Sequence, residues 1–277
     1  PVYWNVTFDM STYIAEEFND EIYSGVTETF GAPYDRDGTN TIFELAGFEP
    51  YQYEWIETDN PQRVILKIFN IVDDNFFDPE YPYYVVGFFN SLYADDYYNR
   101  NMIHIDNWAY WQRLGAEGYQ WYPETRPELT VTRPHVYEAT VAHEYQHNVH
   151  YDWQPNDDTF MNEGCSMFAE IVCGYEVDPG YINSFFYTPD NSLTTWGDQG
   201  DINILADYGQ ALLWATYLND QYSTEEENFL SQFMYSCIPG IEGINVALEY
   251  FGYEDRFDDV FHNWRLANLI HSNYPGH

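Results

Sequence analysis

The segment His143 to His147, with the sequence HEYQH, is the feature that most constrains this chain. Two histidines four residues apart lie on one face of an α-helix, about one turn apart, so both imidazoles can reach a single metal ion. Glu144 follows the first histidine and would stand beside such an ion as a general base. The segment therefore predicts a helix that presents two ligands and a carboxylate on one side.

A pattern with three fixed positions also arises by chance, so a helix that merely contains two histidines is the alternative. The flanking residues predict a largely buried helix from about 134 to 151, because Pro134 suits a first helical turn and most of the other residues are apolar. Histidine and glutamate side chains in such a helix need a partner, since burying them alone is costly. One metal ion would serve all three.

Glu163 supplies the third ligand in this interpretation. It follows His147 after fifteen intervening residues and lies near the start of a second predicted helix, from Asp157 to Tyr175. Two imidazoles and one carboxylate form a zinc-binding set that leaves one position open for water. The alternative set HExxHxxGxxH is excluded, because His150 and Trp153 occupy the positions that would need glycine and histidine.

These motifs resemble those of the gluzincin metallopeptidases, and the segment from 160 to 172, FMNEGCSMFAEIV, is similar to the hyicolysin-like branch. The resemblance implies an α+β, zincin-like fold in a single catalytic domain, residues 1–277. We expect a mixed helix and sheet lobe, 1–151, that includes the zinc helix, an all-helical lobe, 152–277, and the zinc site in the cleft between them. The implied activity is that of a zinc-dependent endopeptidase with Glu144 as general base, acting on protein or peptide substrates.

The chain departs from that family's pattern at two points. The link between His147 and Glu163 is shorter than in thermolysin-like members, and Met167 stands where those enzymes have an acidic partner for the first histidine. We expect Glu170, seven residues after Glu163 on the same helical face, to replace that partner, with a solvated surface carboxylate as the alternative. Asn162 is a second candidate for supporting the ligands.

The resemblance also implies a donor for the oxyanion of the reaction. Tyr208 lies at the start of a predicted helix, 207–222, which is similar to the helix that carries a tyrosine donor in aminopeptidase-like members. Ordinary packing is the alternative in a chain with 28 tyrosines. His150 is expected to be a partly exposed histidine at a helix end, with a contact to zinc or substrate as the alternative.

A second hypothesis is a zincin-fold surface or scaffold domain that binds metal without turnover. Met167 favours this hypothesis, because the usual acidic partner is missing, whereas the intact Glu144 favours an enzyme. Aminopeptidase action is the weaker enzymatic option, since no GxMEN-like segment precedes the zinc helix.

The net charge of the chain limits the classes of partner that it can bind. It has 46 acidic and 9 basic residues, a formal net charge of -37. Such a surface repels nucleic acid phosphates and anionic lipid, so we expect neither as a partner. No apolar run is long enough to span a membrane. Charge, aromatic content and the resemblance together favour a secreted or cell-surface protein.

One acidic turn of the sequence is a candidate calcium site. Asp35, Asp37 and Asn40 place oxygen donors around a turn at Gly38, as the first half of a calcium loop does. Glu44 comes too early for a complete EF-hand loop. The turn is therefore either a calcium site completed from elsewhere or a solvated acidic turn.

The remaining pattern predicts the order of elements. We expect a helix capped by Ser11 at about 12–30, and strands near 41–48, 63–72, 84–89 and 102–106. From residue 132 onward only helices are predicted: the two already named, 207–222, 225–235, 241–251 and 256–271. The three cysteines, Cys165, Cys173 and Cys237, form no disulfide framework and are expected to be small buried residues.

Overall fold

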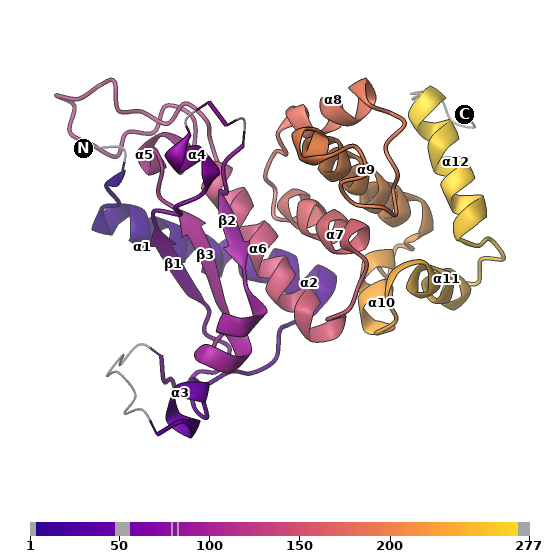
Figure 1. Ribbon diagram of the computed structural model, residues 1–277, viewed down its shortest axis with the longest axis horizontal. Coiled ribbons are helices and arrows are strands. Elements are labelled where there is room, and N and C mark those ends of the chain that lie inside the picture. Colours follow the sequence, from indigo (N-terminus) through magenta and orange to yellow (C-terminus); the bar gives the residue numbers. More distant parts are fainter. Residues whose placement is uncertain (1–3, 48–55, 79, 82, 271–277) are drawn as a thin grey trace. The chain divides into compact units, whose positions relative to one another are not determined.

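The computed structural model describes residues 4–47, 56–78, 80–81 and 83–270 (Figure 1). The chain forms two compact units. Unit 1 comprises the chain up to Glu28, Ala32–Asp152 and Ala169–Val177, and unit 2 comprises Thr29–Gly31, Trp153–Phe168 and the chain from Asp178 onward. A small sheet lies among helices in the first unit and the C-terminal part is helical, so the predicted α+β class is confirmed.

A long helical stretch opens unit 1. Helix α1 (Phe8–Glu17), the π-helical turn η2 (Phe18–Ile22) and α2 (Tyr23–Phe30) follow one another without a break. The stretch begins at Thr7 and not at the predicted Ser11, because the Thr7 hydroxyl accepts a hydrogen bond from the Met10 N–H and so caps the helix.

Three strands form the sheet, in the order β1-β3-β2. Strand β1 (Ile65–Phe69) is parallel to β3 (Met102–Asp106), and β2 (Gly87–Phe89) is antiparallel to β3. All five residues of β3 are buried, as expected of a central strand. The strands predicted near 63–72, 84–89 and 102–106 are thus confirmed, with β3 matching its predicted bounds.

The strand predicted at 41–48 is wrong. Residues Ile42–Leu45 form a short helix, α3, because the side chains of Thr41 and Glu44 each accept a hydrogen bond from the other residue's backbone N–H. This capping box stabilises a helical turn at a segment whose apolar residues alone suggested a strand. Residue 48 lies outside the described residues. Three further short elements of unit 1 were not predicted: α4 (Asp74–Phe77), η3 (Tyr93–Tyr97) and α5 (Tyr110–Arg113).

Two longer helices follow the sheet. Helix α6 (Val136–Trp153) and helix α7 (Thr159–Val172) confirm the two predicted helices that carry the ligand candidates. Helix α6 packs against the opening helical stretch through Tyr145, whose ring lies 5.0 Å from that of Phe18 and 6.0 Å from that of Tyr23, between ring centroids. Helix α7 ends in unit 1 and begins in unit 2.

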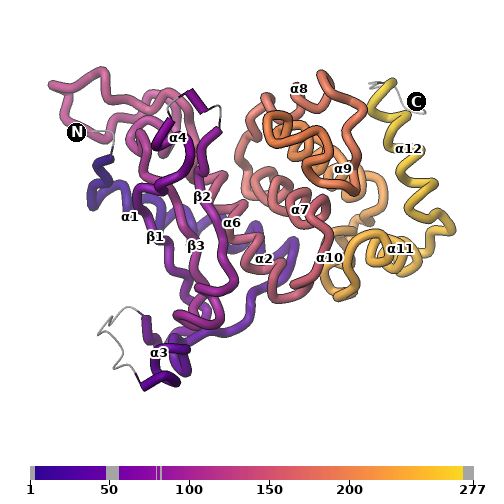
Figure 2. The backbone as a smooth tube through the Cα atoms, in the orientation of Figure 1, coloured from indigo at the N-terminus to yellow at the C-terminus, as the bar shows by residue number. Residues whose placement is uncertain are grey.

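Every regular element in the described part of unit 2 is helical. After α7 these elements are α8 (Pro179–Tyr187), the 3-10 turn η4 (Asp201–Asn203), α9 (Ile204–Tyr222), α10 (Phe229–Tyr235), α11 (Gly240–Tyr250) and α12 (Phe257–Ile270), as the tube in Figure 2 traces. Helix α8 was not predicted; it is capped by Asp178 and packs on α9. Gly209 permits this contact, since a Cβ there would lie 2.1 Å from the Tyr181 carbonyl oxygen.

The cysteines are free, and they are not alike. Cys165 is buried, Cys173 is half-buried and Cys237 is exposed. The expectation of small buried residues is therefore confirmed for Cys165 and wrong for Cys237. No helix within the described residues has the length and apolar character needed to cross a membrane.

Candidate metal centre

The two histidines of α6 converge as their spacing predicts. Their Nε2 atoms lie 3.1 Å apart, and both residues are half-buried on one face of the helix. Glu144 lies beside them on α6 with 7% of its surface exposed. Two imidazole nitrogens that point at one another can both serve as ligands of the same ion.

Glu170 orients the first histidine. Its Oε1 atom lies 3.0 Å from His143 Nδ1, and each of the two side chains is only 12% exposed. A carboxylate accepts hydrogen bonds, so Nδ1 carries the hydrogen and Nε2 keeps its lone pair for a metal. Burial raises the pKa of Glu170, and the bond to His143 opposes that rise. The expected contact is thus present, although its role in metal binding stays a prediction.

Glu163 completes a group of three. It lies seven residues before Glu170 on α7, so the two carboxylates share one face of that helix. One ligand atom from each of His143, His147 and Glu163 lies within 4.8 Å of the other two, and all three residues are half-buried. This group could hold a metal ion, and the described residues contain no second group of at least three His, Cys, Asp or Glu side chains with that arrangement.

The donor set fits a borderline divalent ion. Ligand atoms at about 2.1 Å from a tetrahedral zinc ion lie about 3.4 Å from one another. The 3.1 Å separation of the two Nε2 atoms is close to that value, so the histidines are nearly in a binding arrangement. Two imidazoles and a carboxylate suit zinc, but they also suit other first-row transition metals.

Both ends of α6 are anchored by buried polar contacts. At the start, Glu138 is fully buried and accepts hydrogen bonds from the Tyr13 hydroxyl, at 2.9 Å, and the Gly115 N–H, at 2.6 Å. At the end, the Arg36 guanidinium donates to both carboxylate oxygens of Asp152, at 2.8 and 2.5 Å. A helix fixed at both ends holds the side chains between them in place.

Strand β2 lies directly against the candidate site. A Cβ on Gly87 would lie 3.1 Å from Cγ of Glu144, so the strand backbone passes close to this carboxylate. The Asp106 N–H donates a hydrogen bond to the Val86 carbonyl, so residues 86 and 106 form a hydrogen-bonded pair of the antiparallel ladder. Hydrogen-bonded and non-hydrogen-bonded pairs alternate along such a ladder, so the next pair, Gly87 and Ile105, is non-hydrogen-bonded. The backbone N–H and C=O groups of Gly87 and Phe89 therefore point to the open edge of the sheet. The sequence contains one indication of this close approach, a glycine within a predicted strand.

The structure places Tyr208 in an aromatic environment on α9. Its ring lies 5.0 Å from Trp196 and 5.8 Å from Tyr181, between centroids, and the residue is half-buried. Its role as an oxyanion donor stays a prediction.

Asn162 directly precedes Glu163 on α7, where its carbonyl accepts a hydrogen bond from the Ser166 hydroxyl at 3.1 Å. Its support of the ligands likewise stays a prediction.

The expected position of His150 in the last turn of its helix is confirmed, but the expected partial exposure is wrong. The residue is fully buried, and its Nδ1 atom lies 3.1 Å from Nε2 of Gln146, one turn earlier. The last turns of α6 are buried at Val149, His150 and Asp152, so His150 lies at a helix end that is not exposed.

The acidic turn near residue 37 is ordered by its own hydrogen bonds. Asp37 Oδ1 accepts from the Thr39 N–H at 3.0 Å and the Thr39 hydroxyl at 2.8 Å, and these bonds hold the pKa of Asp37 below its usual value. Asp35 accepts from the Gln62 side-chain amide, and Asn40 has a left-handed φ of 59°. Because these contacts already order the turn, calcium is not needed to explain its shape and remains a prediction.

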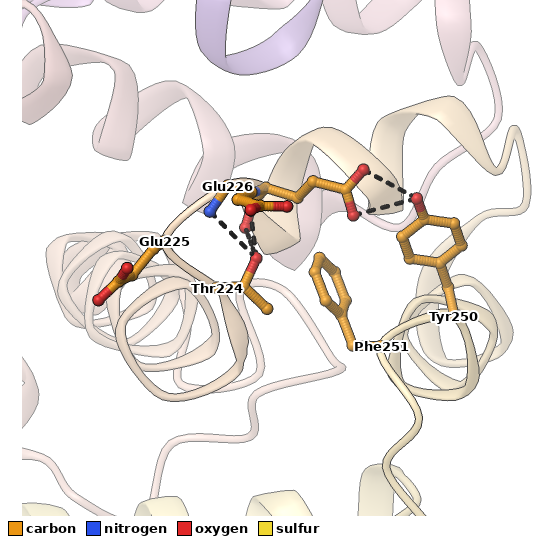
Figure 3. Close-up of a pocket in the computed structure, with 6 residues that line it drawn as sticks. Thr224, Glu225, Glu226, Tyr250 and Phe251 are labelled. Carbon is orange, nitrogen blue, oxygen red and sulfur yellow. Dashed lines mark hydrogen bonds between the residues drawn. The ribbon is translucent and has the colours of Figure 1, made fainter.

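An open pocket in unit 2 has a different character. It has a volume of about 660 Å³ and is lined by acidic, hydroxyl and aromatic side chains (Figure 3): Thr224, Glu225, Glu226, Glu227, Tyr250 and Phe251. The Tyr250 hydroxyl donates to the Glu227 carboxylate, 3.0 Å from each oxygen. None of the candidate site residues lines this pocket, and histidine is absent from it.

Comparison with known proteins does not identify this site. No protein-family model matches the chain, and no curated protein sequence matches it significantly. The chemistry of the site therefore rests on its own residues.

Proposed function

We propose that this chain is a zinc-dependent endopeptidase with a zincin-like fold, in which Glu144 is the general base. The observation that carries the proposal is the convergence of His143, His147 and Glu163 within 4.8 Å. Glu144 is adjacent to His143 on helix α6, which supports its proposed role as the base. Two imidazoles and a carboxylate, with a second carboxylate beside them, are the groups needed for metal-assisted hydrolysis of an amide.

Each residue has a stated task. Zinc held by the three ligands would lower the pKa of a water molecule and polarise a peptide carbonyl. Glu144 accepts a proton from the water and passes it to the nitrogen of the leaving amine. Glu170 keeps His143 in the tautomer that has its lone pair on Nε2. Tyr208 is the proposed donor to the oxyanion.

The proposed substrate is an extended peptide segment. The outward N–H and C=O groups of Gly87 and Phe89 would pair with its backbone, adding a strand to the edge of the sheet. Main-chain hydrogen bonds supply the affinity in this mode of binding, so it does not depend on one side chain, which suits an endopeptidase. Resemblance to the gluzincins and the net charge of -37 favour a secreted or cell-surface enzyme, with calcium as an optional second ion.

The test compares the zinc-loaded chain with its Glu144→Ala and Glu144→Gln forms on an unfolded protein substrate. We expect the wild-type chain to cleave, and both variants to bind one equivalent of zinc while cleaving about 10²- to 10⁴-fold more slowly. Anomalous scattering at the zinc edge should locate one ion between His143, His147 and Glu163.

Equal, negligible cleavage by all three zinc-loaded chains would overturn the proposal. That result would favour the alternative, a metal-binding surface or scaffold domain without turnover. Met167 favours this alternative, whereas the contact between the Glu170 carboxylate and His143 supports the enzyme.

A further inference from the structure

Gly87 marks the closest approach of β2 to α6. A Cβ at this position would lie 2.7 Å from Cγ2 of Thr140 and 3.1 Å from Cγ of Glu144. It would also lie 2.9 Å from the carbonyl oxygen of His104 on the neighbouring strand. Since Cβ atoms essentially never lie within 3.0 Å of such atoms, any side chain here would push the strand and the helix apart.

Backbone conformation does not explain this glycine. Ten glycines of the described chain have a positive φ, and Gly87 is not one of them. It lies in a regular antiparallel strand, paired with Ile105, where a residue with a side chain would ordinarily be preferred. The space between β2 and α6 is therefore the reason that only glycine fits.

The contact bears on the general base directly. Thr140 and Glu144 are four residues apart on α6, so they lie on the same face and both meet Gly87. The backbone groups of Gly87 also point to the open edge on which a peptide would pair. One residue thus sets the separation between Glu144 and the strand that would hold the substrate.

We propose that Gly87 is a positioning residue for peptide hydrolysis, because its missing side chain sets the distance between Glu144 and a peptide paired on β2. This inference rests on the proposed endopeptidase function. Alanine at this position keeps the N–H and C=O groups that pair with substrate, so KM stays near the wild-type value. The kcat value falls about 10- to 100-fold, because displacement of a reacting group by about 1 Å can cost about 10²-fold in rate.

The test relieves the clash at one defined atom. Gly87→Ala is measured alone and in combination with Thr140→Ser or Thr140→Val, each compared with the corresponding Thr140 single variant. Serine removes the methyl group that lies 2.7 Å from the added Cβ but keeps the hydroxyl that donates to the Val136 carbonyl at 2.7 Å. Valine keeps that methyl group. We expect Thr140→Ser to restore kcat about tenfold in the Gly87→Ala chain and Thr140→Val to restore none.

Gly25→Ala is the control for a clash elsewhere. Its Cβ would lie 2.8 Å from the Cys173 sulfur, and its three nearest atoms all belong to Cys173 and Val172, at the end of α7, and not to α6. It should lower the melting temperature without lowering kcat per folded molecule. Zinc stoichiometry, measured for every variant, should remain at one, which gives a readout independent of activity.

The outcomes separate the two proposals. If the wild-type chain cleaves and Gly87→Ala keeps its kcat, raises only KM, or is rescued equally by serine and valine, the inference on Gly87 is wrong while the endopeptidase stands. If Gly87→Ala does not fold, kcat and KM of the double variant Gly87→Ala/Thr140→Ser are compared with those of Thr140→Ser. An unchanged kcat in the double variant then overturns the inference. If the zinc-loaded wild-type chain is inactive, the endopeptidase proposal fails and the inference fails with it.

Discussion

Two histidine environments in unit 1, one fully buried and one half-buried, differ in what surrounds the rings. His104, at the centre of β3, is fully buried, and within the described residues neither ring nitrogen has a hydrogen-bond partner of normal geometry. Its ring stacks on Phe88, with centroids 4.4 Å apart and planes at 2°, and Tyr93 lies 5.1 Å away. On α6, His143 meets a carboxylate at Nδ1 and a second imidazole at Nε2.

The difference shows what makes a histidine a ligand candidate. Burial, and secondarily the nearby Lys67 ammonium, favours the neutral form of His104, and among the described residues it belongs to no group of side chains that could hold a metal. Carboxylate and imidazole neighbours fix the tautomer of His143 and bring further donors to its lone pair. His104 is therefore a packed aromatic side chain, whereas His143 and His147 belong to a group that could hold an ion.

The largest expected effect tests this division. His147→Ala should weaken zinc binding by about 4 kcal/mol, or about 10³-fold, because it removes one of three protein ligands. Peptide cleavage should be lost with it. His104→Phe should change neither zinc affinity nor cleavage per folded molecule. Competition with a chromophoric chelator measures the affinities, and equal losses in the two variants would remove the distinction between the histidines.

The next effect concerns stability at low pH. Burial, and secondarily Lys67, lowers the pKa of His104 to about 4, and the Phe88 backbone opposes this shift only in part. Because the unfolded histidine titrates near 6.5, the unfolded state binds the proton first as the pH falls. The free energy of unfolding is thus highest above about pH 6.5 and falls progressively towards pH 4. His104 alone accounts for a loss of about 3 kcal/mol over this range.

His104→Phe and His104→Leu should remove that part of the pH dependence. Urea unfolding at intervals between pH 7 and pH 4 measures the slope, and the wild-type slope should exceed that of the variants by up to one proton. His262→Phe, at an exposed position of α12, is the matched control and should leave the slope unchanged. Parallel curves for wild type and both His104 variants would show that His104 does not titrate in this way.

The smallest expected effect tests the partner of His143. Glu170→Gln should weaken zinc binding about tenfold, or about 1.4 kcal/mol, because the amide can still accept a hydrogen bond but loses the negative charge that strengthens the ligand. Glu176→Gln, at an exposed position, is the control for loss of one negative charge from an acidic protein. Equal affinities for the two variants would mean that Glu170 acts only through the overall charge.

Much of the fold followed from local patterns. Helices α6 and α7 and strand β3 were predicted because their periodicity and end residues are read from neighbours along the chain. The segment 42–45 was mispredicted because two capping side chains outweighed its apolar character. Helix α8 was missed although Asp178 and Pro179 mark its start.

The sequence by itself determined the spacing of His143, Glu144 and His147 on one helical face, since that spacing depends only on helix geometry. It also proposed Glu163 and Glu170, whose positions on one face of α7 follow from the same geometry. Only the tertiary structure decided that Glu170 meets His143, that Gly87 meets Glu144, and that His104 is enclosed by aromatic rings. Those contacts join segments far apart in the chain, and packing between elements, not local periodicity, decides which side chains meet.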